Sequence, residues 1–350
     1  MMNYDVLNSV PRLLMCADLR PAQGDRFQPT GFADLGPAEY TRPDADGKTG
    51  VSMLLVESAQ SMANRLEKTC LDGDGPEIDP ALEGLPYVAV TLKPTNEKMP
   101  SIRTSSLVEA HRLASPYVLK TKAGGATFGD KIAAEMSYTS KGPLDWKKIY
   151  ATLLRYDPNS LIHGVFLSLI GDGRVRVQRA VTGFIEAENV KQVISGGVKN
   201  SAVDPKGEIQ VEGTEGGEKG VYSNVPYSRV EYVAENIRAY FNLDLALIRG
   251  YGLPEAPTQL ITALSLLKIR RFLSTQLRLR TACNFDLKAD ARATNLEDYT
   301  LPSEGELLPE VQRLIQASGE FFANPAVTEL ETPVKLVSAK EKEKAAGAQG

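Results

Sequence analysis

Hydrophobic and polar residues alternate in several short stretches of the chain, and this period of two predicts β-strands. In the stretch 12–20, every second residue from Leu13 onward is apolar, and Cys16 makes the other face apolar as well. Apolar residues on both faces are typical of a strand in the centre of a sheet. The same reasoning predicts further strands and one hairpin, at 87–93, 241–247, 278–285 and 165–178.

Apolar residues that recur every three or four positions predict helices instead. Leu55, Met62 and Leu66 recur in this way within 51–68, and the stretch 258–277 is apolar nearly all round, which predicts a buried helix. Two shorter helices are predicted at 106–114 and 309–322.

Three stretches lack either period. Residues 71–159 are rich in proline and glycine and predict a large insertion, whereas 195–224 combine glycines with charged residues and predict a mobile protrusion. The tail beyond Lys335 is predicted to be disordered. The order of the remaining strands and helices resembles a ferredoxin-like βαββαβ core with one extra strand, so we expect an α+β fold.

Composition narrows the function. The chain has 350 residues and a formal net charge of -4, which argues against a protein that coats duplex DNA through excess Lys and Arg. It shows neither the features of a signal peptide nor an apolar run long enough to span a membrane, which predicts a cytoplasmic protein. The three cysteines lack CxxC spacing and only two histidines exist, so we expect neither a metal site nor a cofactor.

Positive charge is concentrated in the stretch 259–285, which contains no Asp or Glu. Its five cations are Lys268, Arg270, Arg271, Arg278 and Arg280. The first three have an ordinary explanation, because cations near a helix carboxyl end complement its dipole by roughly 0.3–1 kcal/mol each. That explanation suits Arg278 and Arg280 less well, and an anionic ligand is the alternative.

Two further groups of residues suit a nucleic acid. Ser58, Ser61, Asn64 and Arg65 lie along one strip of the predicted helix, although such a strip is commonly just a solvated border. The loop 21–32 carries hydrogen-bonding residues and two aromatics, Phe27 and Phe32. With the basic segment, they suit single-stranded RNA, which proteins bind through backbone electrostatics and base stacking.

Sequence patterns typical of enzymes are lacking: the chain has no GxxxxGK[ST], GxGxxG, HExxH or GxSxG motif. Asp18 and Asp25, near the end of the first strand, leave one catalytic alternative open, a Mg²⁺-dependent cleavage of RNA.

Two long strings, at 12–32 and 54–67, give the chain a family resemblance. They resemble the RAMP-type Cas-seven backbone subunit of CRISPR subtype I-U, also called I-G, and the resemblance extends over 12–285. It implies a ferredoxin-like or RRM-like palm with large insertions. In this division the palm comprises 1–70, the hairpin region 160–194 and 225–330. The finger-like insertion is 71–159, the thumb-like protrusion is 195–224, and 331–350 form a disordered tail.

The resemblance also implies a function: a non-catalytic subunit that polymerises as a helical filament along the spacer of a CRISPR RNA. It would present this guide for pairing with a target DNA strand in antiviral defence, together with other Cascade subunits and without a membrane. Predicted RNA contacts, carried over from the resemblance, are Arg20, Gln23, Arg26, Gln28, Ser58, Ser61, Asn64, Arg65, Arg270, Arg271, Arg278 and Arg280.

Two alternatives remain open at this point. Related type III backbone subunits cut target RNA with a loop aspartate, which makes Asp25 the residue that would carry a Mg²⁺-dependent endoribonuclease. The other alternative is a metabolic or scaffolding α/β protein, in which the basic segment serves the helix dipole and a protein neighbour.

Overall fold

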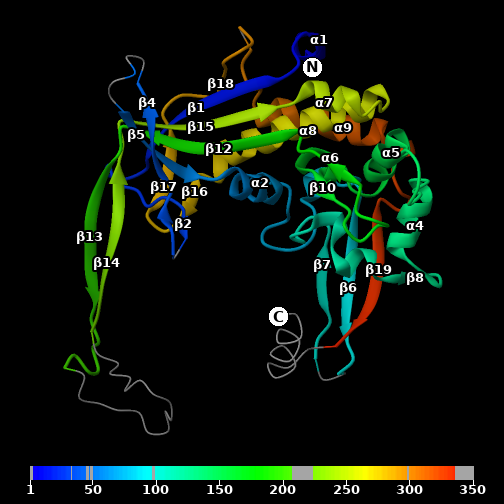
Figure 1. Ribbon diagram of the computed structural model, residues 1–350, viewed down its shortest axis with the longest axis horizontal. Coiled ribbons are helices and arrows are strands. Elements are labelled where there is room, and N and C mark those ends of the chain that lie inside the picture. Colours follow the sequence, from blue (N-terminus) through cyan, green and yellow to red (C-terminus); the bar gives the residue numbers. More distant parts are fainter. Residues whose placement is uncertain are drawn as a thin grey trace.

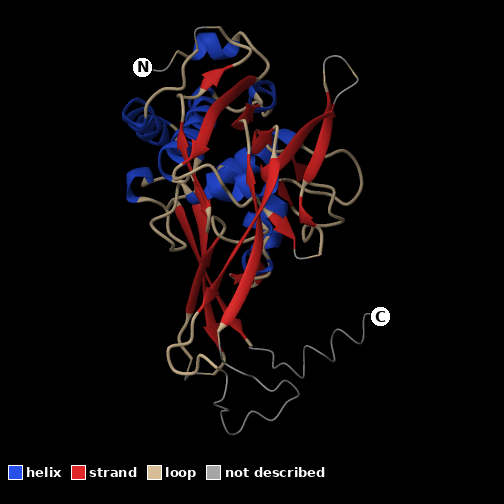
Figure 2. Ribbon diagram, turned by 90° about the vertical axis from the view of Figure 1, so that its left-hand side faces the viewer, coloured by secondary structure: helices blue, strands red, loops and turns tan. Residues whose placement is uncertain are grey.

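The protein forms an arch in a computed structural model that describes residues 3–32, 34–44, 47, 50–96, 99–206, 224–297 and 299–335. A central sheet with packed helices makes the top of the arch, and two elongated parts project from it in the same direction (Figure 1). Seen from the side, helices gather in the upper part and long strands make the lower part (Figure 2).

The central sheet is antiparallel throughout, in the order β16-β17-β1-β15-β12-β5-β4, and β18 also pairs with β1. Because β1 lies between two neighbours, the prediction of a central strand at 12–20 is confirmed. The bounds are β1 (Leu13–Pro21), β4 (Glu39–Pro43), β5 (Gly50–Glu57), β12 (Val181–Glu188), β15 (Asn236–Leu243), β16 (Arg278–Arg280), β17 (Cys283–Leu287) and β18 (Arg292–Ala293).

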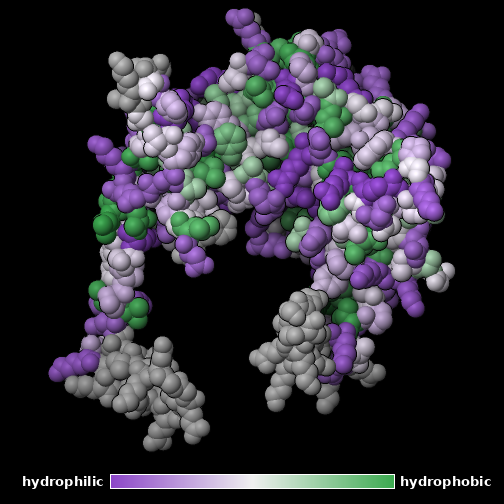
Figure 3. All heavy atoms as spheres, in the orientation of Figure 1, coloured by the Kyte–Doolittle hydropathy of each residue, from purple (hydrophilic) through white to green (hydrophobic). Residues whose placement is uncertain are grey.

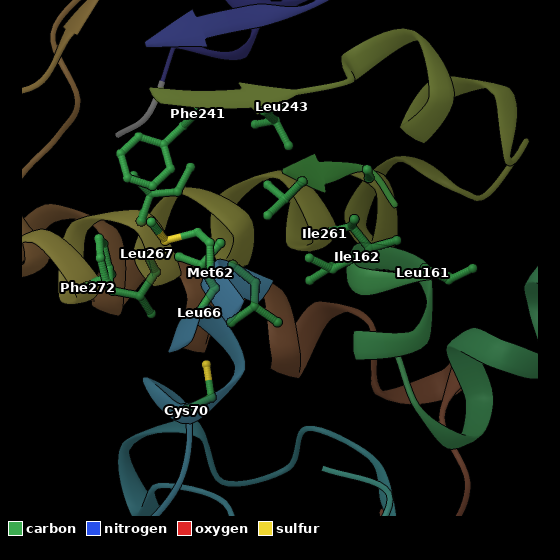
Figure 4. Close-up of a cluster of buried hydrophobic side chains, with 14 of the residues drawn as sticks. Met62, Leu66, Cys70, Leu161, Ile162, Phe241, Leu243, Ile261, Leu267 and Phe272 are labelled. Atoms are coloured by element: carbon green, nitrogen blue, oxygen red, sulfur yellow. The ribbon is translucent and has the colours of Figure 1, made fainter. Parts of the chain in front are cut away.

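Helices pack on one face of this sheet. Met62 and Leu66 of α2 lie in one apolar cluster with Phe241 of β15 and Phe272 of α8 (Figure 4). A Cβ at Gly183 of β12 would lie only 3.1 Å from the Met62 side chain, so glycine permits the close approach of α2. The helices of this part are α1 (Tyr4–Asn8), α2 (Ala59–Lys68), α7 (Leu245–Gly250), α8 (Glu255–Thr275) and α9 (Glu304–Ala317).

The projection that contains the predicted insertion is built around a three-stranded sheet, β19-β6-β7. Its third strand comes from the far end of the chain, since β19 runs parallel to β6. Its elements are β6 (Tyr87–Pro94), β7 (Ile102–Ser105), β8 (Lys122–Ala123), β9 (Ala126–Thr127), β10 (Val165–Phe166), β11 (Arg176–Val177), β19 (Val327–Val334), α3 (Pro116–Leu119), α4 (Phe128–Glu135), α5 (Trp146–Tyr156), α6 (Asn159–His163), η1 (Pro80–Leu82), η2 (Arg112–Ala114) and η3 (Gly319–Phe321).

The other projection is a long hairpin of β13 (Lys191–Lys199) and β14 (Val225–Val233). It overlaps the predicted Gly-rich protrusion at 195–199 only, since β13 starts before 195 and β14 starts at Val225, and 207–223 lie outside the described residues. A further short hairpin, β2 (Gly31–Phe32) and β3 (Gly36–Pro37), lies between β1 and β4 in the chain.

Several predicted elements are wrong in type. The helix predicted from 51 starts only at Ala59, because Ser58 caps it and the buried run before it forms β5. The strand predicted to reach Leu247 ends at Leu243, because the Asp244 side chain accepts from the Leu247 amide and starts α7.

Other boundaries also differ from the prediction. The stretch 106–114 holds only the short helix η2, and 278–285 is a hairpin with a turn at Thr281 and Ala282, where Ala282 adopts a positive φ of 57°. Residues 331–334 belong to β19, so the predicted disordered tail starts too early, and its part from 336 onward lies outside the described residues.

The sheet and the helices on it agree with the mixed α and β class predicted from the pattern. The hairpin predicted at 165–178 forms as the pair β10–β11, and the strand predicted at 87–93 forms as β6. Within the described ranges, no helix combines the length and apolar character needed to cross a membrane.

Candidate nucleic-acid interface

Four segments far apart in sequence meet at the inner corner of the arch, between the base of the long hairpin and α2 (Figure 1). The loop after β1 joins them through its backbone. Gln28 N donates to Ala282 O at 2.8 Å, and Phe27 N donates to Tyr232 O at 2.9 Å. The loop is therefore fixed both to the β16–β17 hairpin and to β14.

The first feature of this corner is a buried carboxylate, Glu57, at the end of β5. Its Oε1 accepts from Arg65 Nε at 2.5 Å and from the Ser61 hydroxyl, and its Oε2 accepts from Arg280 Nη2. The Glu57 side chain is 0% exposed, so these donors offset the cost of burying its charge. We call Glu57, Ser61, Arg65 and Arg280 the Glu57 cluster.

Both guanidiniums of the Glu57 cluster are also anchored to the backbone. Arg65 Nη2 donates to Leu279 O at 2.6 Å. Arg280 Nη1 donates to Val56 O at 3.2 Å and to Gln28 O at 3.3 Å. These contacts join α2, β5, β16 and the loop, so each guanidinium is held in one orientation.

The second feature is Glu231 of β14, whose side chain is 8% exposed. It lies 3.4 Å from Arg26 Nη1 and 3.6 Å from Arg229 Nε, and it accepts from Ser195 Oγ at 2.6 Å. We call Glu231, Ser195, Arg26 and Arg229 the Glu231 cluster. It touches the loop again, because Arg229 Nη1 donates to Gln28 Oε1 at 3.4 Å.

The structure therefore brings together five of the predicted RNA contacts, namely Arg26, Gln28, Ser61, Arg65 and Arg280. Ser58 accepts from the Ser61 amide as the cap of α2, and Asn64 is exposed beside Gln60. Gln23 is exposed in the loop.

Arg20 and Arg278 lie apart from this set. Arg278 is opposite exposed Asn284, whereas Arg280 is opposite buried Cys283, because the register shifts between the two arginines. Arg20 is exposed opposite Asp286.

Phe27 does not offer a stacking platform. It is 0% exposed and packs against Phe285 with ring centroids 5.6 Å apart, so its expected contact with bases is wrong. The Phe32 side chain lies outside the described residues.

Arg270 and Arg271 occupy a different environment, in the carboxyl-terminal part of α8. Arg270 Nη1 lies 2.7 Å from Asp290, and Arg271 lies 2.7 Å from both Asp79 and Glu304. Their RNA contact stays an untested prediction, and their guanidiniums are already paired. The helix-dipole explanation is also incomplete, because these cations have side-chain partners of their own. Arg270 and Arg271 face carboxylates, and Lys268 Nζ lies 3.0 Å from the His163 ring.

The two aspartates of the catalytic alternative differ in environment. Asp18 lies 2.7 Å from Arg292 and 3.0 Å from Arg238, and the hydrogen bond from Arg292 is the main cause that lowers the pKa of Asp18. Asp25 is exposed in the loop. Over the described part of the chain, no group of three or more His, Cys, Asp or Glu is arranged to hold a metal ion.

Sequence reasoning missed Glu57, Glu231 and Arg229. The position of Glu57 offered a signal, because an acidic residue that directly follows an apolar strand and precedes a helix cap is well placed to pair with cations. Glu231 and Arg229 offered none, since no strand was predicted at 225–233.

Residues 13–192, just over half of the chain, match the model of a protein family described as CRISPR-associated protein GSU0053. None of the curated proteins compared with the chain matches it. Among solved structures, the chain is similar to one described as "CRISPR RNA-guided surveillance complex, pre-nicking", with 14% identity and a TM-score of 0.39. That similarity covers 96% of this chain and 100% of the other.

Proposed function

The chain belongs to the CRISPR-associated GSU0053 family, and from this premise we propose that it is a non-catalytic, RNA-binding backbone subunit of a type I-U (I-G) Cascade complex. In this proposal, copies of the chain follow one another along the spacer of a CRISPR RNA. They hold it while its bases pair with a target DNA strand. Other Cascade subunits complete the assembly.

The strand order supports an RRM-like palm. The four strands β17-β1-β15-β12 are adjacent, α2 lies between β1 and β12 in the chain, and α8 lies between β15 and β17. This is two interleaved βαβ units, the arrangement expected of a ferredoxin-like core. On this proposal β4, β5, β16 and β18 are the strands added to the core. The β19-β6-β7 part is the fingers and the β13–β14 hairpin is the thumb.

The observation that carries RNA binding is the excess of arginine at the inner corner of the arch. Four guanidiniums there share two carboxylates, Glu57 and Glu231. The space-filling view shows a hollow face between the two projections, beside this corner (Figure 3). A concave face with surplus guanidiniums suits a single strand held by its phosphates, without reading of its bases.

Head-to-tail repetition accounts for the proposed filament. A backbone subunit repeats one heterologous contact, and such contacts build open helices when they do not close into a ring. The protein itself then needs no sequence preference, because the guide selects the target.

The test is binding of two RNAs of equal length, a CRISPR RNA and an unrelated sequence, in buffer that contains Mg²⁺. We expect equal affinities, several copies per RNA and intact RNA after incubation. Native mass spectrometry gives the copy number, and a denaturing gel shows whether the RNA is cut.

Two outcomes would contradict the proposal. Failure of the protein to bind either RNA at low salt would favour the scaffolding alternative. Cleavage that disappears in Asp25→Ala while binding persists would establish the endoribonuclease alternative instead.

A further inference from the structure

The two clusters at the inner corner have the same ratio of carboxylates to guanidiniums. In each of them, one buried carboxylate faces two guanidiniums, so each carries one uncompensated positive charge. Within the described ranges, these four arginines make no ion pair with any other carboxylate. Gln28 connects the clusters, since its backbone oxygen accepts from Arg280 and its side-chain oxygen accepts from Arg229.

The uncompensated charges are accessible to solvent although the carboxylates are not. The arginine side chains are 21% exposed at Arg65, 25% at Arg280, 31% at Arg229 and 56% at Arg26. Each carboxylate thus holds its guanidiniums from the inside and leaves part of each open on the outside. This is the arrangement that a bound anion needs.

We propose that the Glu57 and Glu231 clusters are paired subsites for two phosphates of one RNA strand, an inference that rests on the proposed function. Each phosphodiester carries one negative charge and so matches the single surplus charge of one cluster. Gln28 and the backbone around it link the two subsites. Glu57 and Glu231 are positioning residues, because they hold the arginines that touch the phosphates and do not touch the phosphates themselves.

This assignment predicts an effect with an unusual sign. Glu57→Gln and Glu231→Gln each make the protein more positive, which by charge alone should strengthen RNA binding. If the carboxylates orient the guanidiniums, both changes weaken binding instead, because the arginines no longer hold their positions before the RNA arrives.

The control is Glu188→Gln, which adds the same charge. Glu188 also faces two arginines, Arg42 and Arg238, but it lies on the opposite face of the sheet from Glu57. The probe is fluorescently labelled polyuridine RNA, and its dissociation constant is measured over a series of salt concentrations. Thermal unfolding of each variant shows whether it folds.

We expect about tenfold weaker binding for Glu57→Gln, which loses charge-assisted hydrogen bonds to Arg65 and Arg280, and for Glu231→Gln, which loses its ion pairs with Arg26 and Arg229. The slope of log affinity against log salt should flatten by roughly 0.7 for each lost phosphate contact. Glu188→Gln should bind at least as tightly as the wild type and keep its slope.

Unchanged or tighter binding in folded Glu57→Gln and Glu231→Gln overturns the inference while the proposed function stands. Absence of polyuridine binding by the wild type overturns both. Should either Glu variant fail to fold, Arg26→Gln decides, because Arg26 is 56% exposed and its loss should not unfold the protein. An unchanged salt slope of RNA binding in Arg26→Gln would then overturn the inference.

Discussion

The four arginines of the inner corner and the two arginines of α8, Arg270 and Arg271, lie in opposite charge environments. At the inner corner, each pair of guanidiniums shares one carboxylate, whereas Arg270 and Arg271 together face three, namely Asp79, Asp290 and Glu304. The first arrangement leaves positive charge for a ligand, and the second leaves none. The number of arginines in a segment therefore says little about its affinity for RNA until their carboxylate partners are known.

The largest expected effect is on the stability of the protein, when an arginine of α8 is removed. Arg271→Ala removes a donor from Glu304, from the Thr69 carbonyl and from Asp79, which keeps the Ala81 amide. We expect a loss of about 2–4 kcal/mol in the free energy of unfolding, with an unchanged salt slope of RNA binding. Urea unfolding and RNA titration of the same sample measure both. A flatter slope in the folded variant would place Arg271 on the RNA surface and remove the contrast.

A smaller effect is expected when the same residue type is changed at the inner corner. Arg65→Ala should lower the affinity for RNA several-fold and flatten the salt slope by roughly 0.7, because one phosphate contact is lost. Its stability loss should be about 1–2 kcal/mol, since Glu57 keeps Arg280 and Ser61 as donors. Weakened folding with normal RNA binding would mean that Arg65 only supports the structure.

The smallest effect concerns pH. The hydrogen bond from Arg270 lowers the pKa of Asp290, so this pair stabilises the protein above the unfolded pKa of about 4 and loses that contribution as pH falls through the folded pKa. Because the Asp290 side chain is 54% exposed, Asp290→Asn should cost less than about 1 kcal/mol near pH 7. This difference from the wild type should vanish in strong acid. A difference that persists there would show that hydrogen bonding by the neutral group, and not charge, holds Arg270.

Strands and helices with one clear period were predictable. The stretch 12–20 is apolar on both faces and became the central strand β1, and the apolar stretch 258–277 became the buried helix α8. Predictions failed where a residue fitted both the helical and the strand period, or where a capping residue decided that a helix begins. Leu55 fits a helical spacing but lies in β5, and Asp244 starts a helix inside an alternating run.

About half of the interface residues could be predicted from the sequence. Ser61 and Arg65 share a strip that helical spacing predicts, and the lack of acids in 259–285 drew attention to Arg280. The sequence could not show that Arg270 and Arg271 of this segment are paired with carboxylates away from the inner corner. Arg271 pairs with Asp79, almost two hundred residues away in the chain, and no local pattern records such a pairing.

The sequence by itself determined the central strand, the long buried helix and a surplus of arginine in an otherwise acidic chain. Only the tertiary structure decided which arginines keep a surplus charge. Glu57 and Glu231 come from different strands and meet the loop after β1 only when the sheet has formed. The physical reason is that electrostatic pairing depends on distance in space, whereas sequence patterns report only local periodicity.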